Sequence, residues 1–157
     1  MPYPKKYVGH YSALAQYLSK NGYRVYPMEM FCEPVPVMKT EKRWRYGKQE
    51  TYQERHWLYG NVDVAAWKNG KLYAFEVKHR GDKVKTALLQ TENYAKYFDY
   101  ACVVAYDLKE LMKYRSQFQA LGVGTYYVDG EFKLLDEPKL QMPDEKEHAK
   151  LYDRFLR

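Results

Sequence analysis

The chain has few cysteines, no long apolar run and no obvious leader. Its two cysteines, Cys32 and Cys102, are isolated within apolar stretches, which favours buried free thiols over a disulfide, and their spacing matches no zinc motif. No segment approaches the roughly 20 apolar residues of a membrane span, and Met1–Lys6 is not followed by the apolar stretch of a secretory signal. We therefore expect a cytoplasmic protein that does not associate with membranes.

What the chain does have is enough apolar material for a core and an excess of positive charge. Hydrophobic residues make up 46% of the chain, and its 157 residues are about the size of one domain, which predicts a single domain over 1–157. The net charge is +6, and from Glu131 to the end there are only six basic residues against seven acidic ones, so the excess lies in 1–130. Net charge alone fits a polyanionic partner and ordinary solubilising charge about equally well.

The stretch from Leu58 to Arg80 is predicted to form a β-hairpin. Two strand-like runs flank Asn69-Gly70, and Asn-Gly is the strongest short hairpin signal because a type I′ turn needs positive φ at both central positions. With this pair as the two-residue loop, Asp63 on the first strand lies directly opposite Glu76 on the second. Opposed Cβ atoms are about 4.5–5.5 Å apart, so the two carboxylates repel unless a cation lies between them.

Lys78 belongs to the same face of this hairpin as Glu76, because side chains alternate along a strand with a period of two. Three charged side chains on one hairpin are also common on an ordinary solvated surface. Here the neighbouring residues are apolar, which predicts that the hairpin is mostly buried. Buried charges need an oppositely charged partner or a metal.

The rest of the chain alternates between helical and strand patterns. Asp82 is the expected N-cap of the helix that follows the hairpin. The predicted elements are helices at 10–21, Asp82–Phe98, 108–120 and 144–157, and strands at Tyr23–Phe31, Tyr100–Tyr106, Gly124–Val128 and 131–135. This order predicts α/β layers around a mixed sheet, with a core over about 10–128 and a C-terminal extension over about 131–157.

An insertion at about 33–56 interrupts this pattern and reads as a long loop or a mobile hairpin. Its basic residues alternate with aromatic ones, which suits contact with a nucleic-acid backbone and bases. The residues that we expect to bind nucleic acid here are Lys42, Arg43, Trp44 and Arg45. Glutamates in the same segment weaken the pattern, so a binding loop and a solvated insertion both stay open.

On the helix after the hairpin, Gln90 and Tyr94 share a face because they are four residues apart. Lys83 and Tyr97 lie alongside that face. A helix packed next to the hairpin could direct these four side chains toward the acidic site. Ordinary helix packing is the alternative explanation for Gln90 and Tyr94.

The order α-β-β-β-α-β, with Asp63 and then Glu76-Val77-Lys78 on the next strand, resembles the PD-(D/E)xK nuclease superfamily. Gly60-x-x-Asp63 and Gln90-x-x-x-Tyr94 are similar to additional motifs of its RecB-type and Holliday-junction-resolvase-like members. A valine stands directly before Asp63, where the family often has a proline. The resemblance implies a restriction-endonuclease-like αβββαβ core with a mixed central sheet flanked by helices, carrying the basic and aromatic insertion and a C-terminal helix.

The resemblance also implies a metal site for Mg²⁺ or Mn²⁺. Its ligands would be Asp63, Glu76 and the backbone carbonyl of Val77. Glu29 on the preceding strand is the best match to a further, upstream acid. The alternatives for that upstream position are His10, Glu50 and Glu54.

Roles for the remaining site residues follow from the same resemblance. Lys78 would orient or deprotonate the attacking water, or stabilise charge beside it, while Gln90 and Tyr94 would hold the scissile phosphate or the water. Arg80 and Lys83 are expected to contact phosphates. His79 faces the other way along the strand, so we expect it to be packed.

The function that this implies is a Mg²⁺- or Mn²⁺-dependent deoxyribonuclease in repair, recombination or restriction-like defence. Its partner would be DNA, and small members of the superfamily often act as homodimers, so a homodimer is an option. Two other functions stay open. One is a catalytically inactive nucleic-acid-binding module on the same fold, and the other is a structural interaction protein whose charged hairpin is incidental.

Overall fold

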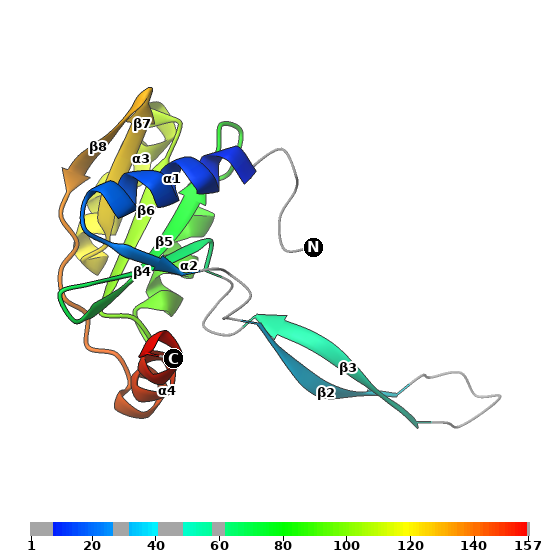
Figure 1. Ribbon diagram of the computed structural model, residues 1–157. Coiled ribbons are helices and arrows are strands. Elements are labelled where there is room, and N and C mark those ends of the chain that lie inside the picture. The colour runs from blue at the N-terminus through cyan, green and yellow to red at the C-terminus, as the bar shows by residue number, and fades with distance from the viewer. Residues whose placement is uncertain (1–7, 27–31, 41–48, 58–61, 157) are drawn as a thin grey trace.

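The computed structural model describes residues 8–26, 32–40, 49–57 and 62–156, and its centre is a six-stranded mixed sheet (Figure 1). In spatial order the strands are β1 (Arg24–Tyr26), β4 (Val64–Lys68), β5 (Lys71–Lys78), β6 (Tyr100–Ala105), β7 (Gly124–Asp129) and β8 (Glu131–Asp136). Within these ranges, four helices flank the sheet: α1 (Val8–Lys20), α2 (Thr86–Tyr94), α3 (Leu108–Leu121) and α4 (Glu145–Leu156).

The sheet mixes antiparallel and parallel pairs. Strand β4 is antiparallel to both of its neighbours, β1 and β5. The pairs β5–β6 and β6–β7 are parallel, and β8 returns antiparallel to β7. Helix α2 carries the chain back across the sheet, as a parallel pairing of β5 with β6 requires. The order α1-β1-β4-β5-α2-β6 confirms the predicted αβββαβ core and the mixed α/β fold class.

The hairpin of β4 and β5 has the predicted turn and register. In the turn Asn69-Gly70 the two φ values are +52° and +76°, as a type I′ turn requires. Pairing continues from the turn without a shift as far as Val64 opposite Phe75. Asp63 is therefore the residue just before the ladder, level with Glu76 as predicted.

Helices cover both faces of the sheet. On one face, which Figure 1 shows in front, Leu18 of α1 packs with Phe75 and Val77 of β5. The other face is covered by α2, α3 and α4, which pack on residues of β5 and β6 that point the opposite way. Because side chains alternate along β5, Glu76 and Lys78 point to this second face. The acidic site therefore lies under α2.

The helix after the hairpin is shorter than predicted, since it spans Thr86–Tyr94 and not Asp82–Phe98. Asp82 is not its N-cap. Its carboxylate instead accepts a hydrogen bond from the backbone N–H of His79 at 2.9 Å. Short polar side chains bond to whichever backbone donor is close, and here that donor lies in the loop leaving β5. The helix itself follows Lys85 without a side-chain cap.

The other elements agree closely with prediction. Strand β1 is described only as far as Tyr26, and Leu151 of α4 is fully buried, as expected for its inward face. Cys102 is a buried free thiol. None of the helices in the described part of the chain is both long and apolar enough to cross a membrane.

The insertion between β1 and β4 is a β-hairpin. Strands β2 (Cys32–Thr40) and β3 (Gln49–Trp57) pair antiparallel along their whole length, from Cys32 opposite Trp57 to Thr40 opposite Gln49. A long loop and a hairpin were both predicted for this insertion, and the hairpin is confirmed. Among the described residues, the two strands form a sheet of their own, and Figure 1 shows it extending away from the main body. We call β2 and β3 the arm.

Candidate active site

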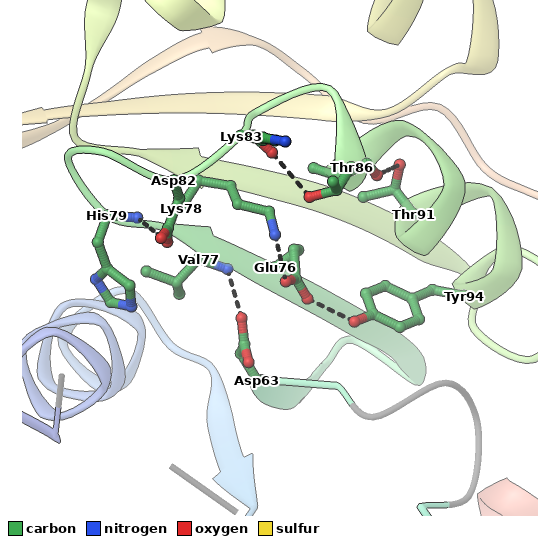
Figure 2. A network of polar contacts seen from close by, with 11 residues as sticks. Asp63, Glu76, Val77, Lys78, His79, Asp82, Lys83, Thr86, Thr91 and Tyr94 are labelled. Atoms are coloured by element: carbon green, nitrogen blue, oxygen red, sulfur yellow. Dashed lines mark hydrogen bonds and ion pairs between the residues drawn. The ribbon is translucent and has the colours of Figure 1, made fainter. Parts of the chain in front are cut away.

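Glu76 lies at the centre of the site, on β5 and beneath α2 (Figure 2). Its side chain is almost completely buried, and both of its carboxylate oxygens have partners. Lys78 Nζ lies 3.3 Å from Oε1, and the hydroxyl of Tyr94 donates to Oε2 at 2.5 Å. The structure thus brings the predicted Glu76, Lys78 and Tyr94 together, from β5 and α2.

Asp63 approaches the same site from the start of β4. The backbone N–H of Val77 donates to Asp63 Oδ2 at 2.8 Å, at the position where the β4–β5 ladder has ended. In an antiparallel ladder the N–H and C=O of one residue point to the same side. The Val77 carbonyl therefore points to the same side of β5 as its N–H, which is the side from which Asp63 approaches.

Burial and mutual repulsion act on the two carboxyl groups. Desolvation is the main cause that raises the pKa of Asp63 well above its usual range, and the negative charge of Glu76 raises it further. Desolvation also raises the pKa of Glu76, although the charge of Lys78 and the hydrogen bond from Tyr94 oppose that rise. A cation beside the pair would relieve both effects.

The donor set suits a hard divalent cation. Two carboxylates and a backbone carbonyl are oxygen ligands of the kind that Mg²⁺ and Mn²⁺ prefer. A cation bound between them would favour the ionised form of Asp63, whose pKa is raised mainly by burial and then by the charge of Glu76. Within residues 8–26, 32–40, 49–57 and 62–156, no group of three His, Cys, Asp or Glu side chains gathers at one point. The predicted upstream ligand Glu29 lies outside the described residues.

Of the four side chains predicted to point from α2 to the site, Tyr94 reaches Glu76. Gln90 lies one turn earlier on α2, and its Oε1 is buried without a hydrogen-bond partner in the part of the chain that the structure describes. Lys83 is exposed in the loop before α2. Tyr97 lies beyond the end of α2 and packs against the core cluster that contains Tyr94 and Leu151.

A cluster of aromatic rings lies on the α1 side of β5, the face opposite the acidic site. The sequence predicted only the position of His79 in it. His79 is buried on the α1 side, as predicted, and its ring stacks on that of His10 with centroids 4.6 Å apart. The Nδ1 atoms of the two rings are in contact. His10 also stacks on Tyr106 at 4.0 Å. One signal for this contact was the alternation along β5, which sends His79 toward α1.

The predicted nucleic-acid contacts divide between described and undescribed parts of the chain. Arg80 is exposed just beyond β5, next to the site in sequence. Lys42, Arg43, Trp44 and Arg45 lie outside the described residues. The side chains of Glu50 and Glu54, two alternatives for the upstream ligand, are likewise not described, although both residues belong to β3.

Comparison with known proteins yields one distant structural neighbour. No protein-family model matches the chain, and no curated protein sequence matches it. The structure is similar to the crystal structure of an XisH family protein from Nostoc punctiforme PCC 73102, with a TM-score of 0.42 and 17% sequence identity. That similarity covers 76% of this chain and 89% of the other.

Proposed function

We propose that this protein is a metal-dependent nuclease of the PD-(D/E)xK superfamily that hydrolyses phosphodiester bonds of DNA, in repair, recombination or restriction-like defence. The observation that carries the proposal is the group formed by Asp63, Glu76 and Lys78. A buried carboxylate, a partly buried one and a buried lysine meet at one point of the sheet. Strongly perturbed carboxyl groups of this kind are concentrated at functional sites.

Each residue has a role that its position supports. Asp63, Glu76 and the Val77 carbonyl would hold Mg²⁺ or Mn²⁺, which supplies positive charge to a scissile phosphate and lowers the pKa of a nearby water. Lys78, held at Glu76 Oε1, is within reach of the same space and would orient the attacking water or stabilise charge on the phosphate. Tyr94 holds Glu76 in place through its hydroxyl.

Gln90 is the side chain most suited to contact the substrate from α2. Its carbonyl oxygen has no protein partner among the described residues, so it can accept a hydrogen bond from the attacking water. Arg80 and Lys83 are exposed and positively charged at the same end of β5, where they would bind phosphates on either side of the cleaved bond.

The test is a cleavage assay with purified protein and Mg²⁺ or Mn²⁺. Substrates are single-stranded, duplex, flapped and four-way-junction DNA, each labelled at one end. We expect cleavage by the wild type and a loss of at least 100-fold in Asp63→Asn, Glu76→Gln and Lys78→Met. Glu92→Gln, which changes an exposed acid on α2, is the matched control and should cleave as the wild type does. Equal cleavage by all variants would refute the site.

One observation favours a second function, a nucleic-acid-binding module without catalysis. Only two carboxylates meet at the site among the residues that the structure describes. Calorimetric titration with Mn²⁺ separates the two functions. Binding that disappears in Asp63→Asn/Glu76→Gln supports the nuclease, whereas DNA binding without Mn²⁺ binding supports the module.

A further inference from the structure

Lys78 supplies positive charge to the acidic site from within the protein. It lies two residues after Glu76 on β5, so both side chains point to the α2 face of the sheet. Its Nζ atom is 3.3 Å from Glu76 Oε1, and its side chain is only 10% exposed. Figure 2 shows the lysine extending along the strand to the carboxylate. The ammonium group therefore lies against one of the two acids and largely out of solvent.

The two partners of the Glu76 carboxylate differ in how easily they can leave it. Tyr94 donates to Oε2 at 2.5 Å, and its ring is completely buried in the core, so packing fixes this contact. Lys78 reaches Oε1 through a flexible four-carbon stem. Of the two contacts, the ion pair with Lys78 is the one that can open without moving a helix.

Charge determines which cations the site can hold at the same time. The negative charges of Asp63 and Glu76 and the positive charge of Lys78 act on one another at short range. One ammonium group offsets only one of two ionised carboxylates, whereas a divalent cation offsets both. Like charges a few ångströms apart repel strongly at a site from which water is largely excluded. A metal held by the carboxylates and an ammonium group on Glu76 Oε1 therefore exclude each other.

We propose that Lys78 exchanges with the metal ion at Glu76. In the metal-free protein Lys78 neutralises Glu76, and when a metal binds the lysine leaves Oε1 and turns toward the substrate phosphate. The inference rests on the proposed nuclease function and deepens it, because it makes the lysine available to substrate only after the metal has bound. Each phosphate of the DNA backbone carries a negative charge, so it would replace the partner that Lys78 has left.

The experiment is a calorimetric titration of the metal-free protein with Mn²⁺ at pH 8, with no DNA present. Lys78→Met removes the ammonium group, and Lys78→Gln removes the charge but keeps an N–H donor for Glu76 Oε1. Lys78→Arg keeps the charge. The matched control is Lys71→Met, which removes an exposed lysine at the other end of the same strand.

Removing the charge of Lys78 should tighten Mn²⁺ binding. We expect Lys78→Met and Lys78→Gln to bind Mn²⁺ roughly 10-fold more tightly than the wild type, because no ammonium group competes for Glu76. Lys78→Arg and Lys71→Met should bind Mn²⁺ as the wild type does. Since Lys78→Met should also reduce cleavage, metal affinity and activity change in opposite directions. Loss of a metal ligand, as in Asp63→Asn, lowers both.

Thermal unfolding of the same variants gives a second measurement. Without metal, Lys78→Gln leaves the buried carboxylate of Glu76 without its cation, so we expect a melting temperature about 5–10 °C below that of the wild type. Saturating Mn²⁺ supplies the missing charge and should raise the melting temperature of Lys78→Gln more than that of the wild type. A lysine that only supports the fold would give the same difference with and without Mn²⁺.

Mn²⁺ binding that is equal or weaker in both Lys78→Met and Lys78→Gln would overturn the exchange. If the wild type still cleaves DNA in that case, the nuclease function stands. If both variants bind Mn²⁺ more tightly but the wild type cuts no DNA, the exchange stands and the catalytic function fails. Binding of Mn²⁺ by none of the proteins would refute the metal site and both proposals with it.

Discussion

The hydroxyl of Tyr94 donates a hydrogen bond of 2.5 Å to Glu76 Oε2 and so joins α2 to the strand that carries the acidic site. Both side chains are buried, Tyr94 completely. The charge of Lys78 is the largest influence that opposes the rise in the pKa of Glu76 caused by burial, and the hydrogen bond from Tyr94 adds to it. The packing of α2 against β5 thus affects the pKa of an acid on that strand.

Removing the hydroxyl of Tyr94 should lower the affinity for metal at low pH and reduce the stability of the fold only moderately. Tyr94→Phe keeps the ring but raises the pKa of Glu76 further, so a larger share of the acid is protonated at low pH. We expect a lower Mn²⁺ affinity at pH 6 than in wild type, a smaller difference at pH 8, and a stability loss of about 1–2 kcal/mol. Calorimetry at both pH values and urea unfolding measure these changes. The control Tyr127→Phe, on β7, should leave Mn²⁺ affinity unchanged at both pH values.

Asp63→Asn should make the metal-free protein more stable, increasingly so as pH rises. The pKa of Asp63 is raised in the folded state, so from about pH 4 upward the folded protein holds a proton that the unfolded chain has lost, and the stability of the wild type falls as pH rises through this window. Asparagine keeps an acceptor for the Val77 N–H without the charge. We expect a gain on the order of 1–3 kcal/mol at pH 8 and little at pH 4.

Urea unfolding at several pH values, with and without Mg²⁺, measures this gain. Saturating Mg²⁺ should stabilise the wild type and cancel the advantage of Asp63→Asn. Asp129→Asn, at the exposed end of β7, is the control and should show no such pH trend. An advantage of Asp63→Asn that is the same at pH 4 and pH 8 would contradict the assigned cause.

Asp136→Asn should destabilise the far edge of the sheet without affecting the site. The carboxylate accepts hydrogen bonds from Arg115 Nε at 2.9 Å and from the hydroxyl of Thr125 at 2.6 Å, and Arg115 contributes most to lowering the pKa of Asp136 to about 2. A lowered pKa stabilises the fold above the ordinary value of about 4, and that contribution disappears as pH falls toward 2.

We therefore expect Asp136→Asn to lose about 1–2 kcal/mol of stability at pH 7 and much less near pH 2.5, since the pair is partly exposed. Thermal or urea unfolding at the two pH values measures the difference. Mn²⁺ affinity should stay at the wild-type value. An equal loss at both pH values would show that the ion pair with Arg115 is not its source.

Leu151→Ala tests whether the C-terminal helix belongs to the same folding unit as the site. Leu151 is fully buried in the cluster that contains Val62 and Tyr94. Val62 directly precedes Asp63 in the chain, and Tyr94 donates a hydrogen bond to Glu76. We expect a loss of about 2–4 kcal/mol in one cooperative unfolding transition. Leu140→Ala, at a side chain 55% exposed, should cost far less. Two separate transitions would contradict the single domain predicted over 1–157.

The hairpin could be predicted from sequence because its geometry is local. The Asn69-Gly70 turn determines which residues face each other, and alternation determines the face of each side chain. Asp63 level with Glu76, Lys78 beside Glu76 and His79 on the opposite face all follow from these two rules. The spacing of Gln90 and Tyr94 placed both on one face of a helix for the same reason.

Other features depend on contacts between segments far apart in the chain. Asp82 carries the pattern of a helix cap, but the His79 N–H was the nearer donor once β5 ended there. The contact of His10 with His79 depends on where α1 crosses the sheet. For the insertion, turn signals and side-chain alternation did not distinguish a loop from a hairpin, because its residues lack the alternation that a buried strand face imposes.

By itself, the sequence determined the turn, the strand register and hence the pairing of the two acids, since these depend on backbone conformations within a few residues. The tertiary structure alone decided what surrounds that pair. Burial beneath α2 raises the pKa values of both carboxyl groups, and the Tyr94 hydroxyl and Lys78 ammonium stabilise one of them. Desolvation depends on everything packed around a group, and no local pattern encodes it.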